Sequence, residues 1–542
     1  MRLLEHHKRA RCCYALGAIA ASGLTVAIGA ATAAGPAGAA AARPPQPNIV
    51  LIQADDQTAN QFTPRVMPQT TRLLARGGTT FSDYIVTTAL CCPSRASLLT
   101  GQYAHDHGVF NNNRSTGGYP ALIDKNNVLP VWLRRAGYNT IHIGKFLNNY
   151  ASAVPDPAQP APGWDDWQSL ISGEGRYYDY NLSDNGVLVH KGTANQDYLG
   201  RVITRKAVRA IGRYAPSPKP FYLEVDPRTP HIARMNRPGR CGSLRNAEPD
   251  PSDMDEFRNA PLPTPPSFNE ADMSDKPAFL RQLPRLSELD RQHVQEHWRC
   301  ALAALVGLDR SVATIFNAVR QAGELSQTVF IYISDNGQFY GEHRVQLGKV
   351  LPYEEALHEP LVIRVPRRYR HGAPRVPRSS APVANIDLAP TILALAHGTP
   401  CLGPGARNPR CRTMDGRSLM PLLTGSGNWP SQRSLLLEYR SLNPARHETC
   451  IFDGVRTPRT VYVEHYAVAD PATGGCQSTL QVERYNLKQD PFELRNQCVA
   501  GIPSNCPTSP EQSKLEQDLQ RLRDCAGIQG RDQQVDGRPF CG

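Results

Sequence analysis

The chain has 542 residues, of which 40% are hydrophobic and 20% charged, with 42 glycines and 47 prolines. This is enough apolar material for a sizeable core, and the length predicts about two domains. The composition excludes a mainly disordered chain, a collagen-like repeat and a coiled coil. A formal net charge of +11 favours anionic partners, but it does not distinguish sulfated glycans from nucleic acid.

The N-terminal segment predicts export. Lys8, Arg9 and Arg11 precede an apolar, Ala/Gly-rich run over residues 12–34, and small residues follow before Arg43. An uncleaved anchor is the alternative, although Ala and Gly are weakly apolar for that role. We expect residues 1–42 to be a cleaved signal peptide and the protein to be secreted or extracytoplasmic. The mature chain keeps a charge of +8, because the segment holds four basic residues and one acidic residue. We expect no other stretch to be long and apolar enough to span a membrane.

The cysteines also favour an oxidising compartment. Of the fourteen, ten fall into couples that are adjacent along the sequence, which are Cys241 with Cys300, Cys401 with Cys411, Cys450 with Cys476, Cys498 with Cys506, and Cys525 with Cys541. Ordinary buried thiols are the alternative, because sequence does not fix connectivity.

Four short β-branched runs each end in polar residues that can do chemistry. They cover residues 48–54 before Asp55 and Asp56, 139–143 before Lys145, 221–225 before His231, and 328–334 before Asp335 and Asn336. Helical patterns cover 67–75, 131–136, 197–211 and 293–322. The alternation predicts an α/β fold, with a mostly parallel sheet sandwiched by helices. Ligands bind such sheets beyond the carboxyl ends of the strands, so these polar residues are expected to converge.

Two further regions of the sequence differ in pattern from the strand and helix alternation. Residues 237–284 are rich in Pro, Asp, Asn and Ser, which predicts a long surface excursion. After residue 425 the pattern predicts short strands at 434–438, 460–467 and 482–487 and a helix at 512–523. We therefore expect a catalytic domain over 43–425 and a smaller antiparallel α+β domain over 426–542.

The segment from residue 89 to 101 reads ALCCPSRASLLTG. Pro93 suits the first position of a helix and Gly101 suits its end, which places Cys91 at a helix N-terminus. Free amide donors and the helix dipole favour an anion there. A lone cysteine at such a place is also typical of a reactive or disulfide-bonded thiol.

The pattern Cys-x-Pro-Ser-Arg followed by Leu-Thr-Gly resembles the signature of type I sulfatases. The doubled cysteine and the segment GKFLNNY at 144–150 are similar to the branch that contains N-acetylglucosamine-6-sulfatases. The resemblance, over about residues 48–425, implies an alkaline-phosphatase-like fold and hydrolysis of aryl or glycan sulfates, including 6-O-sulfated glucosamine. It also implies a maturation partner, the formylglycine-generating enzyme, which oxidises Cys91 to formylglycine. One hydroxyl of the hydrated aldehyde attacks sulfur, and the second re-forms the aldehyde as sulfate departs.

The resemblance further implies a calcium site. Asp55, Asp56, Asp335 and Asn336 match the metal-binding residues of the family, together with the modified Cys91. Four oxygen-bearing side chains are a set that suits a hard cation. A paired Asp or a DNG tripeptide alone is more often a turn or cap.

Arg95, Lys145 and Lys349 match the family positions that hold sulfate, and His231 matches the histidine that protonates the leaving oxygen. Solvated surface charges are the alternative for the lysines. Leu147 stands where many sulfatases have a second histidine, which leaves the base for sulfate release open. His142 and His343 are the candidate substitutes.

Two other functions compete with the sulfatase interpretation. A phosphate or phosphonate ester hydrolase of the same fold acts on esters of similar shape but different charge. A secreted protein that only binds sulfated glycan is the second, and the full set of catalytic residue types argues against it. We expect no nucleic acid partner, and membrane contact only through the export signal.

Overall fold

The computed structural model describes residues 45–542 except 173–174, 235–236, 244, 371, 403–409, 443–448, 471–472 and 474. The expected signal peptide over 1–42 lies outside the described residues. Pro44–Gly542 forms one compact unit. The boundary expected near residue 425 stays a prediction.

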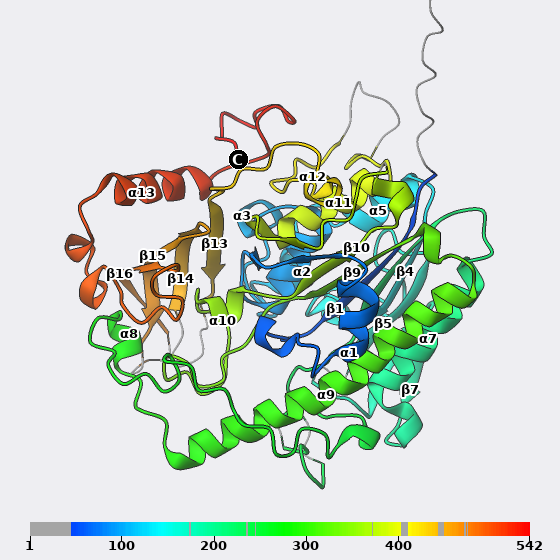
Figure 1. Cartoon of the computed structure of the whole chain (residues 1–542), viewed down its shortest axis with the longest axis horizontal. Coiled ribbons are helices and arrows are strands. Elements are labelled where there is room, and N and C mark those ends of the chain that lie inside the picture. Colours follow the sequence, from blue (N-terminus) through cyan, green and yellow to red (C-terminus); the bar gives the residue numbers. More distant parts are fainter. Residues whose placement is uncertain are drawn as a thin grey trace, which may run out of the picture. The chain divides into compact units, whose positions relative to one another are not determined.

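A ten-stranded sheet runs through the molecule (Figure 1). Its five central strands are parallel neighbours, in the order β9 (Thr328–Ser334), β1 (Asn48–Ala54), β8 (Phe221–Asp226), β4 (Asn139–Gly144) and β5 (Asp166–Ser172). One side continues through β10 (Leu361–Arg364), β2 (Thr79–Phe81) and β11 (Arg378–Ser379), and the other through β6 (Tyr180–Asp184) and β7 (Val187–Lys191). The mixed, mostly parallel sheet confirms the predicted fold class.

The central strand β1 shows why these apolar runs form a sheet covered on both faces. All seven of its residues are buried. Ile49 and Leu51 belong to one hydrophobic core, with residues of α2 (Cys91–Thr100), α5 (Leu129–Arg135) and α11 (Leu388–Leu395). Val50 and Ile52 belong to the other, with α7 (Leu199–Tyr214) and α9 (Glu288–Gln321). Alternate residues of an extended strand point to opposite faces, so each face buries its own set of helices.

The four predicted helices are present with shifted ends. The pattern at 67–75 becomes α1 (Pro68–Thr70), followed directly by a π turn at Thr71–Ala75. Helix α9 begins at Glu288, before the predicted 293, because Ser287 caps it: its hydroxyl accepts a hydrogen bond from the Asp290 amide, and the Asp290 carboxylate accepts one from the Ser287 amide. The shorter helices are α3 (Ala104–His107), α4 (Gly118–Ala121), α6 (Tyr150–Ala153), α8 (Ala278–Arg281), α10 (Glu354–Leu357) and α12 (Met420–Thr424).

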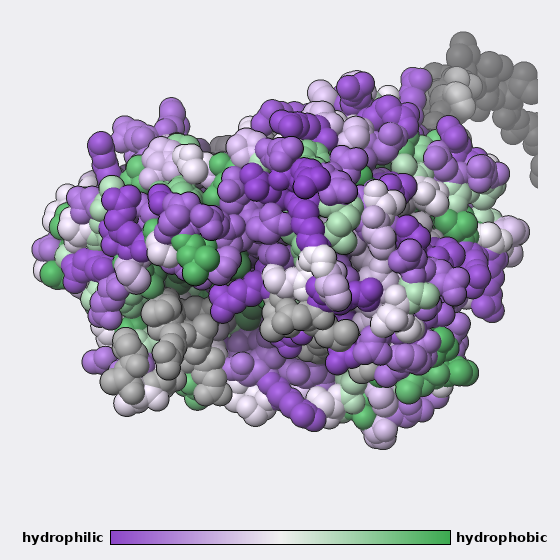
Figure 2. All heavy atoms as spheres, turned by 90° about the horizontal axis from the view of Figure 1, so that it is seen from below, coloured by the Kyte–Doolittle hydropathy of each residue, from purple (hydrophilic) through white to green (hydrophobic). Residues whose placement is uncertain are grey.

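Helix α9 corrects one expectation about membranes. Among the described residues it is a helix long and apolar enough, by length and composition, to cross a bilayer. More than half of its apolar window is buried inside the molecule, where Val312 and Ile315 pack in the core it shares with β1. That burial is typical of a core helix. The molecular face drawn in Figure 2 is mainly hydrophilic, with smaller hydrophobic groups between the polar ones.

The C-terminal region contains a four-stranded antiparallel sheet with its own core. Its strands are β13 (Leu435–Arg440), β14 (Thr449–Arg456), β15 (Thr460–Ala469) and β16 (Cys476–Asn486), with α13 (Pro510–Leu522) packed beside them. The sequence analysis missed β14, whose Asp453 and Gly454 interrupt the alternating pattern. Strands β3 (Tyr84–Ile85) and β12 (Val383–Ala384) form a separate two-stranded ladder.

All five expected disulfides are formed, Cys241–Cys300, Cys401–Cys411, Cys450–Cys476, Cys498–Cys506 and Cys525–Cys541. Cys91 and Cys92 remain as buried free thiols. The stretch 237–284 is largely irregular, as expected, with a short 3-10 turn at Pro251–Asp253 and α8 near its end. It is not only a surface excursion, because Glu270 and Lys276 are buried in the fold.

Candidate active site

Cys91 is the first residue of α2, and only 1% of it is exposed. Gly101 ends the helix in the left-handed conformation with φ 70°, as expected. Pro93 is the third helical residue and not the first, so that detail of the prediction is wrong. The amides of the whole first turn lack helical partners, and a proline is therefore tolerated there. Cys92 faces away into the core and is fully buried.

The predicted carboxylates meet because their strands are neighbours in register. Ala54 at the end of β1 pairs with Ser334 at the end of β9, so Asp55 and Asp335 follow side by side. The Asp56 amide donates to Asp335 Oδ1 at 3.2 Å, and Asn336 Nδ2 donates to Asp56 Oδ1 at 2.7 Å. Asp56 has a left-handed backbone with φ 70°, a strained state that is typical of functional turns.

These residues fit a hard divalent cation. Ligand atoms of Asp55, Asp56, Cys91 and His231 lie within 4.8 Å of one another. The Cys91 Sγ lies 3.6 Å from Asp55 Oδ1 and 3.9 Å from Asp56 Oδ1. The side-chain oxygen of Asn336 is buried and has no hydrogen-bond partner, as expected of an oxygen kept for a cation.

Two lysines from different parts of the chain reach the carboxylates beside Cys91. Lys145 Nζ lies 2.7 Å from Asp55 Oδ2, and Lys349 Nζ lies 2.9 Å from Cys91 Sγ and also contacts Asp56 Oδ1. Gly144, just before Lys145, has φ 117°, and a Cβ there would come within 2.1 Å of the Asp226 carbonyl oxygen. Only glycine allows β4 to approach β8 so closely at the turn that directs Lys145 into the site.

Arg95 lies behind the nucleophile and does not line the cavity beside it. Its Nε lies 2.8 Å from Asp335 Oδ2, and its Nη1 lies 2.7 Å from Asp226 Oδ1. Arg95 therefore ties α2 to the ends of β8 and β9. The sequence analysis missed Asp226. Its position at the end of β8 was the available signal.

The charges in the site are strongly coupled. Burial raises the pKa of Asp55, but Lys145, His231 and the neighbouring arginines together outweigh it and leave that pKa well below its ordinary value. Burial and the neighbouring Asp55 raise the pKa of Asp335 to about 6. Burial also raises the pKa of the Cys91 thiol to about 11, against the opposing effect of Lys145. The unmodified thiol is therefore mainly protonated at neutral pH and is a weak nucleophile.

His231 lies beside the carboxylates, with Nε2 3.7 Å from Asp56 Oδ2 and Nδ1 2.8 Å from the Ile232 carbonyl oxygen. Burial, together with the nearby Arg228 cation, lowers its pKa to about 3, although Asp55 acts in the opposite direction. The other two histidines that were candidates for the base do not line the cavity at Cys91. His142 is buried within β4 beside Ser169 and Asp226, and His343 is buried beside Glu270.

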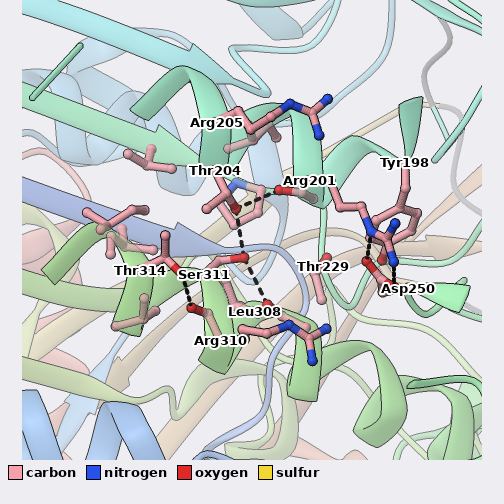
Figure 3. Close-up of a pocket in the computed structure, with 18 of the residues that line it drawn as sticks. Tyr198, Arg201, Thr204, Arg205, Thr229, Asp250, Leu308, Arg310, Ser311 and Thr314 are labelled. Atoms are coloured by element: carbon pink, nitrogen blue, oxygen red, sulfur yellow. Dashed lines mark hydrogen bonds and ion pairs between the residues drawn. The ribbon is translucent and has the colours of Figure 1, made fainter. Parts of the chain in front are cut away.

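A cavity of about 240 Å³ opens onto Cys91. It is lined by the predicted Lys145, His231 and Lys349, and by residues the sequence analysis did not select, among them Asn112, Asn148, Arg228 and Arg234. A larger cavity of about 390 Å³ lies between α7 and α9, with Arg201 and Asp250 paired at its edge (Figure 3). That second cavity holds none of the predicted catalytic or metal-binding residues.

Comparison with known proteins identifies the family of this chain. Residues 47–399 match the model of the family described as Sulfatase, and residues 341–524 match that of the N-sulphoglucosamine sulphohydrolase C-terminal region. An arylsulfatase of Volvox carteri is 33% identical over 499 residues, covering 84% of this chain and 72% of its own. An N-acetylglucosamine-6-sulfatase of Capra hircus is 30% identical over 514 residues, covering 89% and 84%.

A solved structure described as a complex with D-Glucosamine-2-N, 6-O-disulfate shares the fold, with a TM-score of 0.67 and 24% identity, over 88% of this chain and 97% of that one. The match to the family model covers more than half of the chain and includes the strand ends that surround Cys91. The chain therefore belongs to the sulfatase family of sulfuric ester hydrolases.

Proposed function

We propose that this protein is an exported, calcium-dependent glycan sulfatase whose nucleophile is formylglycine made from Cys91. The observation that carries the proposal is the environment of Cys91: a helix N-terminus with Lys349 Nζ 2.9 Å from Sγ and the Asp55 carboxylate 3.6 Å away. A site that combines cations, carboxylates and free helical amides suits a sulfate group and a hard cation together.

The roles of the side chains follow from their positions. Formylglycine, once formed and hydrated, supplies a hydroxyl that attacks sulfur and a second hydroxyl that allows sulfate to leave. Lys145 and Lys349 line the cavity and hold the sulfate oxygens as charge moves onto them. Arg95 positions α2 through Asp226 and Asp335. His231 lines the same cavity and is the group that exchanges a proton with the leaving oxygen.

Asp55, Asp56, Asp335 and Asn336, with the modified Cys91, would hold the cation. Calcium is favoured over a softer metal because carboxylate and amide oxygens dominate the set. When bound, calcium would polarise the sulfate oxygens and balance the charge of the carboxylates. The protein's own part is to keep Asn336 Oδ1 free for this cation and to hold the Asp56 turn in its strained conformation.

We infer that the substrate is a sulfated sugar and, more specifically, a 6-O-sulfated glucosamine. The Capra hircus relative is named for that reaction, and Arg228, Arg234 and Asn148 give the cavity wall polar groups that suit a sugar. Export is favoured by the five disulfides, which need an oxidising compartment. The formylglycine-generating enzyme must then meet the chain before it folds, because Cys91 is buried in the folded protein.

The first experiment is a peptide mass measurement across residue 91 in the protein purified from a host that carries the maturation enzyme. We expect the aldehyde mass at Cys91 and an unmodified thiol at Cys92. Cys91→Ala should abolish arylsulfate hydrolysis, whereas Cys92→Ala should keep a substantial fraction of it. A fully active protein with an intact Cys91 thiol would contradict the proposed nucleophile.

The second experiment compares kcat/KM for 6-O-sulfated N-acetylglucosamine, an aryl sulfate and the matching aryl phosphate. We expect the sulfated sugar to be the best substrate and the phosphate the worst, because the additional negative charge of a phosphate dianion repels the formylglycine oxygen that must attack it beside Asp55, Asp56 and Asp335. Faster phosphate turnover would favour the phosphate or phosphonate ester hydrolase instead. Cleavage of the aryl sulfate alone would remove only the glycan assignment.

A further inference from the structure

A second group of potential metal ligands lies outside the cavity at Cys91. One ligand atom from each of His343, Glu355 and Glu493 lies within 4.8 Å of the other two. His343 follows β9, Glu355 belongs to α10, and Glu493 follows β16. His343 is 0% exposed and Glu493 is 1% exposed, while Glu355 is half-buried. One segment, through His343 and Glu355, and the distant residue Glu493 therefore bring nitrogen and oxygen ligands to one buried point.

Each of these side chains keeps one polar atom without a hydrogen-bond partner. The three atoms are His343 Nε2, Glu355 Oε2 and Glu493 Oε1. A buried polar atom left without a partner costs free energy of about 1–3 kcal/mol, so three in one cluster require an explanation. His343 Nε2 and Glu355 Oε2 are 3.8 Å apart, close to the ~3.4 Å between neighbouring ligands of a tetrahedral zinc ion.

The other polar atom of each side chain is already held by the protein. His343 Nδ1 lies 2.7 Å from Glu270 Oε2. Glu355 Oε1 accepts a hydrogen bond from Ser267 Oγ at 3.1 Å, and Glu493 Oε2 accepts one from the Glu354 amide at 2.9 Å. A carboxylate on the far nitrogen of a histidine is the usual support of a metal-bound histidine, because it fixes the tautomer and the ring orientation.

The charge of the cluster also calls for a cation. Glu270, Glu355 and Glu493 are three carboxyl groups, and among the described residues the lysine that pairs with them is Lys276, 3.2 Å from Glu270 Oε1. Burial raises the pKa of Glu493 well above its ordinary value, so this group is mainly protonated at neutral pH unless a cation binds it. Lys276 Nζ reaches only the backbone carbonyl oxygen of Glu493 and not its carboxylate. Buried charges that lack a partner are expensive unless they are paired or bound to a metal.

We propose that His343, Glu355 and Glu493 form a structural zinc site that is separate from the calcium site. One imidazole nitrogen and two carboxylate oxygens suit zinc better than calcium, and a water molecule would complete the four-coordinate shell. His343 and Glu355 enclose the segment that carries Lys349, whose ammonium group contacts Cys91. The zinc ion would thus fix both ends of the segment that brings this lysine to the nucleophile, and join it to the C-terminal region through Glu493.

The test is metal analysis of the purified full-length protein after dialysis in calcium buffer with a weak zinc chelator, followed by titration with zinc chloride. We expect one zinc per chain in the wild type. Cobalt(II) used as a probe should give the visible absorption of a tetrahedral site. Glu493→Gln should abolish both, and Glu270→Gln should weaken zinc binding by about 10–100-fold, the range for removing a carboxylate that supports a ligand.

Two control variants test whether the loss of zinc is specific to this site. Glu464→Gln removes a carboxylate from β15 of the C-terminal sheet. The Glu464 oxygens accept hydrogen bonds from Tyr462 and Tyr466, so this variant should leave zinc binding unchanged. Asp335→Asn should lower calcium content but keep the zinc. Glu355→Gln, at a half-buried position, replaces Glu493→Gln if that variant fails to fold. Absence of stoichiometric zinc in the wild type, or full zinc binding in both ligand variants, would overturn the proposal.

Discussion

Removal of the Arg95 guanidinium should be among the most damaging single changes near the site. Its ion pairs with Asp226 and Asp335, at 2.7 and 2.8 Å, join side chains that are almost completely buried. Breaking a buried pair from one side leaves an uncompensated charge, and such changes cost about 3–5 kcal/mol. We therefore expect Arg95→Ala to lose that much stability, in addition to its arylsulfatase activity.

Arg134→Ala is the matched control. Arg134 Nε lies 2.8 Å from Asp165 Oδ1, the same distance, but the two side chains are 57% and 30% exposed. Solvent screening limits such pairs to about 0–1 kcal/mol. The two variants therefore compare arginine–carboxylate contacts of equal distance at very different burial, two contacts for Arg95 and one for Arg134.

Scanning calorimetry converts these values into temperatures. At about 2.1 cal/mol/K per residue, the roughly 500 residues of the compact unit have an unfolding entropy near 1 kcal/mol/K. Arg95→Ala should therefore lower Tm by about 3–5 °C, and Arg134→Ala by about 1 °C or less. Adding Asp226→Asn to Arg95→Ala should recover part of the loss, because it removes one of the unpaired charges. Equal shifts for the two arginine variants would refute the reasoning from burial.

Three further predictions concern other parts of the molecule. Asp335→Asn should reduce calcium content and kcat/KM together, measured by elemental analysis and arylsulfate hydrolysis, whereas retained calcium would argue against this ligand. Replacing both Cys241 and Cys300 by serine should cost about 2–4 kcal/mol in calorimetry, because their bridge closes a loop of 59 residues. Burial alone would lower the pKa of His105, but Glu438, 3.2 Å from Nδ1, raises it to about 10. The stability advantage of the wild type over His105→Gln, about 1.5–3 kcal/mol, should hold below pH 6.5 and disappear as the pH rises through 10, which unfolding across that range will show.

The sequence predicted the site best where local pattern and topology act together. An apolar run followed by Asp55 or Asp335 marks the end of a buried strand, and the rule for parallel sheets brings such ends to one edge. The approach of Lys349 to Cys91 could not be predicted in this way. Lys349 lies on a loop without a regular sequence pattern, and the fold brings its Nζ to 2.9 Å from Cys91 Sγ.

The two errors about the site, at Asp226 and His343, also have physical causes. Strand β8 was expected to stop at residue 225, so Asp226 was overlooked as the last strand residue and the partner of Arg95. His343 was a candidate base, but its left-handed backbone, with φ 50°, is part of a turn that buries the ring beside Glu270. Sequence proximity to a site does not determine on which side of a turn a side chain emerges.

The charge balance around Cys91 indicates which stage of the reaction the proposed site favours. Five cations, Arg95, Lys145, Arg228, Arg234 and Lys349, outnumber the four carboxylates Asp55, Asp56, Asp226 and Asp335. A bound divalent cation would add two more positive charges. In the proposed mechanism, cleavage of the substrate ester transfers the sulfate group to formylglycine as a second monoester, which carries the same single negative charge. The sulfate dianion forms only when the bond from formylglycine to sulfate breaks, so the excess of positive charge favours this second step. The same attraction holds the product, so the residues that favour this second step also oppose the departure of sulfate.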